Sequence, residues 1–539
     1  MNTDFMGNSV TKRSDDNANA RVGIDYIGVV APRTAVSVSE LSKAIGQDAD
    51  KLEKGLGIRG IRWPGYSQNN STMVAEAIYN FISKLESEPE MRERFMRERP
   101  NAIYYSTESN SDHSRPDLMS SMRMVYSKLL STSERYRDYV EIFKRCDIVP
   151  VTFACAGAGL SLTNAVEHVA ASRDRSAIVI SVDTSIYDNS RAPNAEATQG
   201  AASTLTWVTR NPSLVAISED VNYSSFNMPV SDFTKFGDHR PKVYGGFSRI
   251  MYIYLAGNAF EGVEREYMAK NGRSILDVTD MAVAHVPFPK QAIEYVGVLF
   301  GHYLKLPQNE ALLREITSRE SIGKSPLNGD SFTELITRKL KAFASHNEQE
   351  IVSTIESDKE IRDYLNWVKT VRSESEAKEF ISRLHVNDSL ALPSVIGNSY
   401  SSAAIVALTS SLSSKNTLNA KRGLVVFYGS GAVSKVVPID LIDNGADTCA
   451  VRAKHIDIDI GADSPIQMDA DQYTELHGSK MSGEAERVMS NGDLITKDAK
   501  LLRGSIPKGF HIRRYFDDGT CEPAYIGVDG KAQDLEFKF

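Results

Sequence analysis

The run Val149-Pro-Val-Thr-Phe-Ala-Cys155 is apolar and stops at Ala-Gly-Ala-Gly, residues 156–159. Apolar residues then recur at helical spacing from Leu162 to Val169, and Ala177-Ile-Val-Ile-Ser-Val182 indicates a fully buried strand. This order of strand, tight turn, helix and strand predicts a mostly parallel sheet covered by helices. The fold class that follows is α/β, with Cys155 at the turn between a strand and a helix.

The same alternation of expected strands and helices continues on both sides of this unit. Upstream, Val22 to Val30 and Ala102 to Tyr105 indicate strands, and Glu108 comes just after the second of them. Downstream, residues 275–285 resemble a strand that reaches a turn, and residues 423–428 indicate a buried strand that runs into Gly-Ser-Gly. We therefore expect two αβ halves in tandem.

The domain organisation can be predicted from shifts in composition. Residues 1–20 are polar and aperiodic, which predicts a disordered tail. The expected halves then span 21–222 and 223–539, and the charged, helically spaced stretch from about 308 to 390 predicts a helical insertion in the second half. Strand-like segments near the end, 510–515 and 524–528, predict a final antiparallel edge.

Composition excludes several functional classes. The 62 Lys and Arg residues are outnumbered by 70 Asp and Glu, for a net charge of -8, and no basic segment resembles a nucleic-acid surface. No apolar run approaches the roughly 18 residues that span a membrane, so we expect a cytoplasmic protein. The four cysteines form no CxxC pair and no HExxH helix occurs, so neither a disulfide framework nor a metal site is predicted.

Cys155 is the first candidate for chemistry. A thiol between a strand end and a helix start receives the positive end of the helix dipole, which predicts a lowered pKa and a reactive thiolate. The glycines at 157 and 159 fit a turn whose backbone amides could stabilise an oxyanion. A small buried thiol beside a glycine turn fits the same local sequence.

Two further residues lie at the ends of expected strands. His285, in His-Val-Pro-Phe-Pro-Lys290, is followed by prolines that stiffen its loop, which suits a general acid or an oxyanion donor. Glu108 follows a buried strand, where desolvation could raise its pKa enough for proton abstraction from carbon. A satisfied core or surface histidine, and an acidic residue at a helix N-terminus, are the alternatives.

Taken together, these segments resemble the 3-hydroxy-3-methylglutaryl-CoA synthase family of the thiolase superfamily, from about Val22 to about Gly527. The matching segments, in family order, are VGIDYIGVVAP (22–32), STESNSDHS (106–114), ACAGAG (154–159), ATQGAAST (197–204), HVPFPK (285–290), GNSYSSA (397–403) and FYGSG (427–431). The resemblance implies a thiolase-like fold whose two halves form a layered α-β-α-β-α body, and it identifies the chain as a divergent member.

The resemblance also implies roles for seven residues. Cys155 is the acyl-accepting nucleophile, Glu108 the general base and His285 the residue that positions the acceptor. Substrate contacts are implied for Asn398, Ser430, Gly200 and Lys290, the last near the CoA phosphates. The implied reaction transfers an acetyl group to Cys155 and condenses it with a β-ketoacyl thioester, to a 3-hydroxy-3-methylglutaryl-type product. No bound cofactor or metal is implied, because coenzyme A thioesters are the substrates.

Several alternatives stay open at this point. Ala156 stands where the family commonly has an aromatic residue, and DFTKFGDHRP (232–241) is only loosely like its family equivalent. Acyl-CoA and acyl-carrier-protein substrates both fit, as do isoprenoid metabolism and polyketide branching. A homodimer is expected by resemblance. A priming-type ketoacyl synthase, another thiolase-fold acyltransferase and a non-catalytic partner subunit are the other functions to be tested.

Overall fold

The structure is a computed structural model, and its description covers a defined part of the chain. It describes residues 21–110, 114–172, 174–187, 195–235, 241–323, 325–326, 331–342, 347–461, 465–481, 493–516 and 521–536. The tail predicted over residues 1–20 lies outside these ranges. Among the described residues, no helix combines the length and the apolar composition needed to cross a membrane.

The first half of the central sheet has the strand order β5-β4-β6-β7-β1. Its strands are β1 (Val22–Val30), β4 (Pro100–Ser106), β5 (Asp147–Val151), β6 (Ser176–Asp183) and β7 (Ala202–Arg210). β4 runs parallel to β5 and β6, whereas β7 is antiparallel to both β6 and β1. The prediction of a mostly parallel sheet is therefore wrong, because β7 returns from β6 without the long helical crossover that a parallel neighbour needs.

The second half of the sheet is built around β12 (Met281–Ala284), β13 (Arg422–Gly429) and β14 (Val433–Leu441). β12 is parallel to β13, and β14 is antiparallel to it. The short strand β8 (Val215–Ile217) pairs with both β14 and β1 and so joins the two halves. β9 (Ser224–Asn227) pairs with β14, and β15 (Ile456–Asp459) runs parallel to β1.

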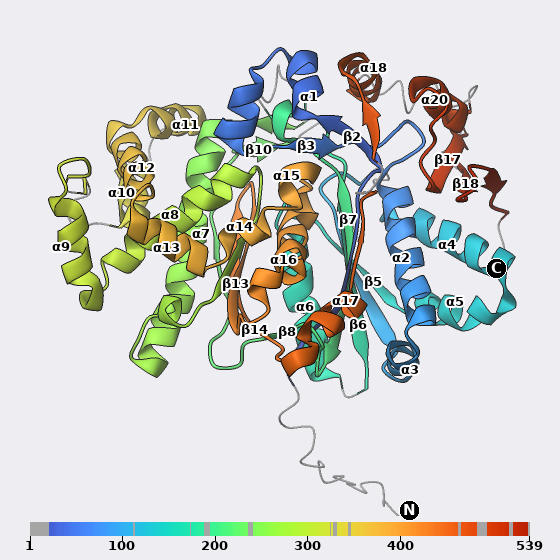
Figure 1. The fold of residues 1–539 in the computed structure, drawn as a ribbon, viewed down its shortest axis with the longest axis horizontal. Coiled ribbons are helices and arrows are strands. Elements are labelled where there is room, and N and C mark those ends of the chain that lie inside the picture. The colour runs from blue at the N-terminus through green and yellow to red at the C-terminus, as the bar shows by residue number, and fades with distance from the viewer. Residues whose placement is uncertain are drawn as a thin grey trace, which may run out of the picture.

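Helices cover both outer faces and fill the space between the halves (Figure 1). α2 (Asn70–Ser87) and α4 (Leu118–Thr132) lie outside the first half, and α7 (Gly245–Asn271) and α8 (Pro289–Leu304) lie outside the second. In the middle, α6 (Gly157–Ala171) packs on β4, β6 and β7, while α16 (Ala403–Ser413) packs on β12 and β13, and the two helices touch. The predicted thiolase-like, layered α-β-α-β-α body is confirmed.

Local sequence explains where several helices begin and end. Ser37 caps α1 (Val38–Ile45) by accepting a hydrogen bond from Glu40 N, and Gly46 ends it in the left-handed conformation. Asn69 and Thr72 form a reciprocal capping box at the start of α2. These caps fix the positions of two elements that flank the sheet.

The described residues of the segment expected to be a helical insertion form helices joined by turns and contain no strand. It contains α9 (Glu310–Ser318), α10 (Phe332–Ala342), α11 (Glu348–Ser357), α12 (Lys359–Val371), α13 (Ser375–Arg383) and α14 (Val386–Ser389). These helices are part of the folded core and do not only cover the surface. Their residues Phe332, Tyr364 and Trp367 are buried and belong to the same apolar cluster as the sheet. Burial of such side chains stabilises a fold by about 1.5–3 kcal/mol each.

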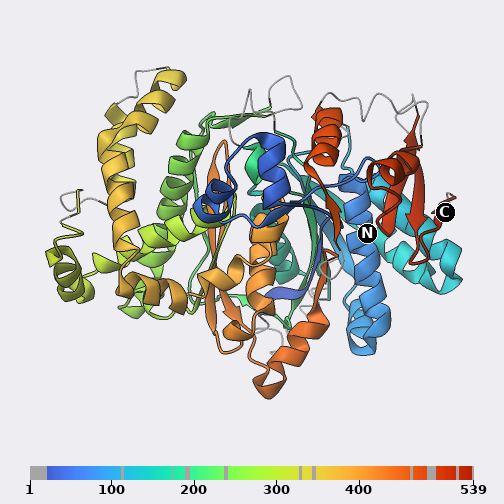
Figure 2. The same cartoon turned by 45° about the horizontal axis from the view of Figure 1, so that its top comes forward.

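The C-terminal elements include a small sheet of their own, and several of their buried side chains join the apolar core of the first half. α18 (Ala470–Met481) and α20 (Leu494–Leu501) precede an antiparallel sheet of β17 (Gly509–Tyr515), β18 (Cys521–Ile526) and β19 (Ala532–Asp534). The predicted strands exist, but they do not form an edge of the central sheet; they pack on α2 instead. Figures 1 and 2 place this unit and the insertion helices at opposite ends of the molecule.

Candidate active site

Cys155 lies in a tight turn between β5 and α6. Phe153 and Cys155 form an isolated bridge, Ala156 N donates to Phe153 O at 3.0 Å, and Ala154 has a φ of 37°. A non-glycine residue in this region is strained, and such strain is concentrated at functional sites. A Cβ on Gly159 would lie 2.3 Å from the Phe427 ring, so glycine lets α6 approach β13 closely. The turn holds Cys155 half-buried between the two halves.

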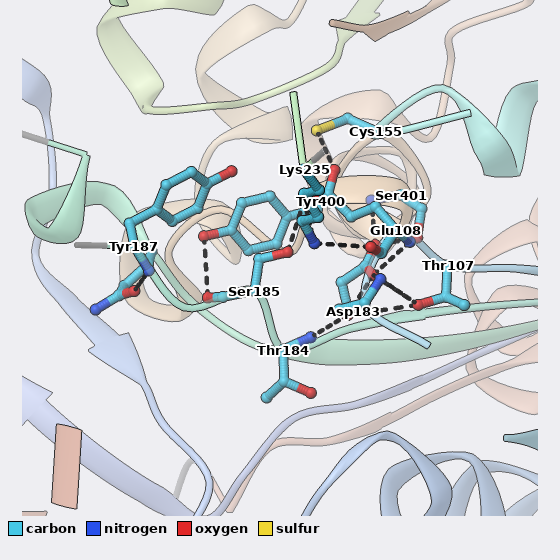
Figure 3. A network of polar contacts seen from close by, with 12 residues as sticks. Thr107, Glu108, Cys155, Asp183, Thr184, Ser185, Tyr187, Lys235, Tyr400 and Ser401 are labelled. Carbon is cyan, nitrogen blue, oxygen red and sulfur yellow. Dashed lines mark hydrogen bonds and ion pairs between the residues drawn. The ribbon is translucent and has the colours of Figure 1, made fainter. Parts of the chain in front are cut away.

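Glu108 follows β4 and contacts the thiol directly (Figure 3). The Cys155 Sγ donates to Glu108 Oε2 at 3.4 Å, and Ser185 Oγ donates to Oε1 at 2.6 Å. The Glu108 side chain is only 3% exposed, so its carboxylate is almost removed from water. The structure thus brings together two candidates that lie 47 positions apart in the sequence.

Asp183, at the end of β6, organises the backbone around Glu108. Its Oδ1 accepts from Thr107 Oγ1 at 2.7 Å, from Glu108 N at 2.8 Å, and from Ser109 N and Oγ at 3.1 and 2.7 Å. Its Oδ2 accepts from Ser401 N at 2.9 Å and from the Ser401 hydroxyl. These six hydrogen bonds connect the ends of β4 and β6 to the segment that precedes α16.

The electrostatics of the thiol differ from the sequence prediction. Burial, followed by the charges of Glu108 and Asp183, raises the pKa of Cys155 well above its ordinary value. The predicted lowering of this pKa is wrong, because burial, together with the nearby carboxylates, disfavours the thiolate that a position just before α6 was expected to stabilise. Burial also raises the pKa of Glu108, against the opposing charge of Lys235. In the free protein, therefore, the thiol keeps its proton and directs it at Glu108.

His285 lies just beyond β12, as predicted, and is buried. Burial lowers its pKa to about 3, so the imidazole is neutral near pH 7. Its Nδ1 has no hydrogen-bond partner among the described residues. Its ring lies 6.2 Å from that of Tyr428, whose neighbour Gly429 packs against Ala156 in the Cys155 turn. The structure connects His285 to the thiol through this segment and gives it no direct hydrogen bond to Cys155 or Glu108.

Asn398 and Gly200 belong to two segments that pack against each other. Asn398 N donates to Thr198 O at 2.8 Å, and Asn398 Oδ1 accepts from Tyr400 N at 2.9 Å. A Cβ on Gly200 would lie 2.2 Å from the backbone oxygen of Ile396, so glycine is required for this contact. The pair therefore positions Tyr400 and Ser401 beside the Asp183 network.

Ser430 follows Gly429, which packs against Ala156 in the Cys155 turn, whereas Lys290 lies at the surface. Ser430 Oγ is 3.2 Å from Ser248 Oγ, and the next residue, Gly431, donates its N–H to Asp232 Oδ1 at 2.7 Å. Lys290 is exposed in the first turn of α8. The described structure shows no contact between the Lys290 side chain and the Glu108–Cys155 network.

Several residues of the network are not predicted from the sequence. Asp183 ends the buried strand expected at 177–182, and a carboxylate at the carboxyl end of a strand that runs parallel to β4 is the signal that could have identified it. Lys235 lies in the segment that resembled the family only loosely. Tyr187 and Tyr400 stack with ring centroids 5.5 Å apart beside Cys155, and nothing in their local sequence indicated this. Asp112, in the Glu108 segment, lies outside the described residues.

Comparison with known proteins places this geometry in a family. The family model described as "Hydroxymethylglutaryl-coenzyme A synthase C terminal" matches residues 330–487. The hydroxymethylglutaryl-CoA synthase of Haloferax volcanii is 25% identical over 463 residues, which cover 85% of this chain and 91% of that protein. The chain is similar to hydroxymethylglutaryl-CoA synthases over most of its length, as a divergent relative.

Solved structures of the family share the fold. MvaS in complex with 3-hydroxy-3-methylglutaryl coenzyme A superposes with a TM-score of 0.62 at 19% identity, covering 94% of this chain and 99% of that one. The curacin-pathway HMG synthase in complex with apo donor-ACP gives 0.62 at 14% identity, covering 94% and 100%. No group of three or more His, Cys, Asp or Glu residues that could hold a metal ion occurs in the described ranges.

Proposed function

We propose that this synthase-family chain condenses an acetyl thioester with a β-ketoacyl thioester through an acetyl-Cys155 intermediate, giving a 3-hydroxy-3-methylglutaryl-type product. The observation that carries the proposal is the 3.4 Å contact between the Cys155 thiol and the buried Glu108 carboxylate. A nucleophile and a base in contact can serve two successive steps, acyl transfer and proton removal from carbon.

In the first step, Cys155 Sγ attacks the carbonyl carbon of the acetyl thioester. The thiol proton passes to Glu108 Oε2, toward which it already points. The leaving thiolate then takes up that proton, so the acetyl group is bound to sulfur and Glu108 is a carboxylate again. The half-buried turn keeps the thioester accessible to the second substrate.

In the second step, Glu108 removes a proton from the acetyl methyl group, and the resulting enolate attacks the ketone of the acceptor. Desolvation raises the pKa of Glu108, which strengthens it as a base for a carbon acid. His285, neutral and with an unused Nδ1, suits a hydrogen bond to the acceptor or to the alkoxide that forms on it. The alkoxide takes up the proton that Glu108 removed, which restores the carboxylate. Water then hydrolyses the thioester, so that the product leaves as a carboxylic acid and Cys155 regains its thiol proton.

The remaining predicted residues support substrate binding in this proposal. Asn398 and Gly200 position the segment that faces the acyl group, Ser430 lies near the acceptor side, and Lys290 at the start of α8 suits the phosphates of a pantetheine carrier. The contact between Glu108 and the thiol favours the synthase over a decarboxylating ketoacyl synthase, which makes its carbanion by losing carbon dioxide.

The form of the acyl carrier and the assembly are the finer points of the proposal. One family structure contains a CoA thioester and another a donor carrier protein, so we propose that this chain takes acyl-CoA or acyl-carrier-protein substrates. We also propose a cytosolic homodimer. Within the described residues β5 pairs only with β4, which leaves one edge of the sheet beside the Cys155 turn for a second copy. Light scattering on the purified protein measures its mass in solution and so distinguishes a monomer from a dimer.

Incubation with acetyl-CoA carrying a labelled acetyl group tests the proposed function. We expect one label on Cys155 by peptide mass spectrometry, none on Cys155→Ser, and an HMG-type product after acetoacetyl-CoA or an acetoacetyl carrier protein is added. The exposed Cys449 serves as the internal control. A folded protein that acquires no label from acetyl-CoA or from acetyl carrier protein would be a non-catalytic subunit.

A further inference from the structure

A lysine from the second half of the chain lies against Glu108. Lys235 directly follows the short strand β10 (Phe233–Thr234), and its Nζ donates a 2.7 Å hydrogen bond to the backbone oxygen of Glu108. The same nitrogen lies 3.9 Å from Glu108 Oε1. The lysine is 24% exposed and the carboxylate 3%, so the ammonium stands between the buried acid and solvent. Figure 3 shows Lys235 beside Glu108 and Cys155.

The surroundings explain why a cation is needed at this position. Asp183 is fully buried, and its Oδ1 lies against the backbone N–H of Glu108. The negative charge of Asp183 raises the pKa of Glu108, and that of Glu108 raises the pKa of the Cys155 thiol. Without a compensating charge, a desolvated carboxylate beside another carboxylate takes up a proton and can no longer act as a base.

We propose that Lys235 is a positioning residue that holds the Glu108 carboxylate ionised and oriented toward Cys155. The geometry supports both parts. Lys235 donates to the backbone oxygen of Glu108, and Asp183 accepts from the backbone N–H of Glu108, so the two residues hold its backbone at both polar groups. The charge lies closer to Oε1, which leaves Oε2 for the thiol. The inference rests on the proposed condensation and adds a residue to its base.

Lys235 is the cation with the strongest influence on Glu108. Among the described residues, the other titratable groups that act on Glu108 or are acted on by it are acids: Asp183 at the end of β6, Cys155 before α6, Tyr187 after β6 and Tyr400 before α16. Removing Lys235 therefore removes the cation that opposes the charge of Asp183.

Two pH profiles of Lys235→Met test this inference. The first is the rate of condensation from preformed acetyl-Cys155. Lys235 lowers the pKa of Glu108, so its removal raises that pKa, and the acid limb should move up by about one pH unit or more. The second is alkylation of Cys155 by iodoacetamide, followed by peptide mass spectrometry. Lys235 also lowers the pKa of the thiol, so its midpoint should move in the same direction.

Matched variants separate charge from packing. Lys235→Arg keeps the charge and should shift either profile by less than about 0.3 units. Lys242→Gln, an exposed lysine on the paired strand β11 (Lys242–Val243), should leave both unchanged. A slower Lys235→Met enzyme with unshifted profiles would overturn the inference, as would an Arg variant that shifts like Met. Alkylation needs no substrate, so it tests Lys235 even if acetyl-CoA fails to label the wild-type protein.

Discussion

The fully buried aspartates Asp183 and Asp498 each organise a hydrogen-bond network, and only the Asp183 network has the properties of an active site. Asp498 accepts from Tyr66 N at 2.7 Å, from Ser67 N at 3.0 Å and from the Ser67 hydroxyl, while Ser67 Oγ lies 2.6 Å from His511 Nδ1. His511 Nε2 is in turn 2.7 Å from Pro507 O. An acid, a hydroxyl and an imidazole thus meet in a closed cluster.

The Asp183 network differs in being open. It ends at a half-buried thiol, and the nearby second half presents His285 with an unpartnered Nδ1. In the Asp498 cluster, Ser67 and His511 both have hydrogen-bond partners, and no accessible thiol adjoins them in the described part of the chain, so nothing is left to contact a substrate. The comparison shows that contact between reactive residue types is not enough to make an active site. The site also needs a nucleophile that a substrate can reach and polar atoms that still lack hydrogen-bond partners.

The largest expected effect is that of Asp183→Asn. In the asparagine side chain, an NH2 group replaces one of the two oxygens that now accept six hydrogen bonds. Because that group would face other donors, we expect a loss of about 3 kcal/mol in the free energy of unfolding, measured in urea. Glu108 should also lose its position relative to Cys155, lowering condensation on the order of a thousandfold. A variant with wild-type turnover would show that Glu108 does not depend on this network.

Asp498→Asn is the matched counterpart. The same substitution in the closed cluster should destabilise the protein by a similar amount, about 3 kcal/mol, because it also opposes buried donors. Turnover per folded molecule should stay within about twofold of wild type. A large loss of turnover in fully folded Asp498→Asn protein would contradict the distinction between the two networks.

His285→Ala is expected to rank next. Loss of a hydrogen-bond donor aimed at the developing oxyanion should reduce condensation by about a hundredfold, while the rate of Cys155 acetylation stays unchanged. His285→Gln, which retains a donor, should recover part of the loss. Rapid-quench measurement of acetylation and condensation checks both variants. A defect confined to acetylation would show that His285 acts in acetyl transfer instead of in condensation.

Ser430→Ala should have the smallest effect. Ser430 shares a hydrogen bond with Ser248 and none with Cys155 or Glu108 among the described residues, so removing this neutral hydroxyl should raise the acceptor KM about fivefold, the equivalent of about 1 kcal/mol. The acetylation rate should not change. Steady-state kinetics with the acceptor varied make this measurement, and a hundredfold effect would place Ser430 among the reacting groups.

The sequence allowed much of the framework to be predicted. The strands that lead to Glu108 and His285, and the turn of Cys155, lie where the apolar runs end, because buried strands leave a clear pattern. Proximity was not predictable in the same way. Lys235 meets Glu108 from 127 positions away, and Asp183 meets Ser401 from 218. The pKa direction of Cys155 failed for the same reason, since it depends on carboxylates that only the fold brings near.

The central claim is that Cys155 carries the acetyl group and that Glu108 is the base that removes a proton from its methyl carbon. Glu108→Gln tests it most directly, because the amide keeps the shape of the side chain but removes the base. The lost negative charge also raises the pKa of the thiol in the wild type, so its removal favours the thiolate and offsets the lost proton acceptor, and acetylation should slow far less than condensation. Intact-protein mass spectrometry after acetyl-CoA and acceptor are mixed should therefore show acetyl-Cys155 accumulating while product formation falls on the order of a thousandfold. Product formation at the wild-type rate in Glu108→Gln would contradict the account.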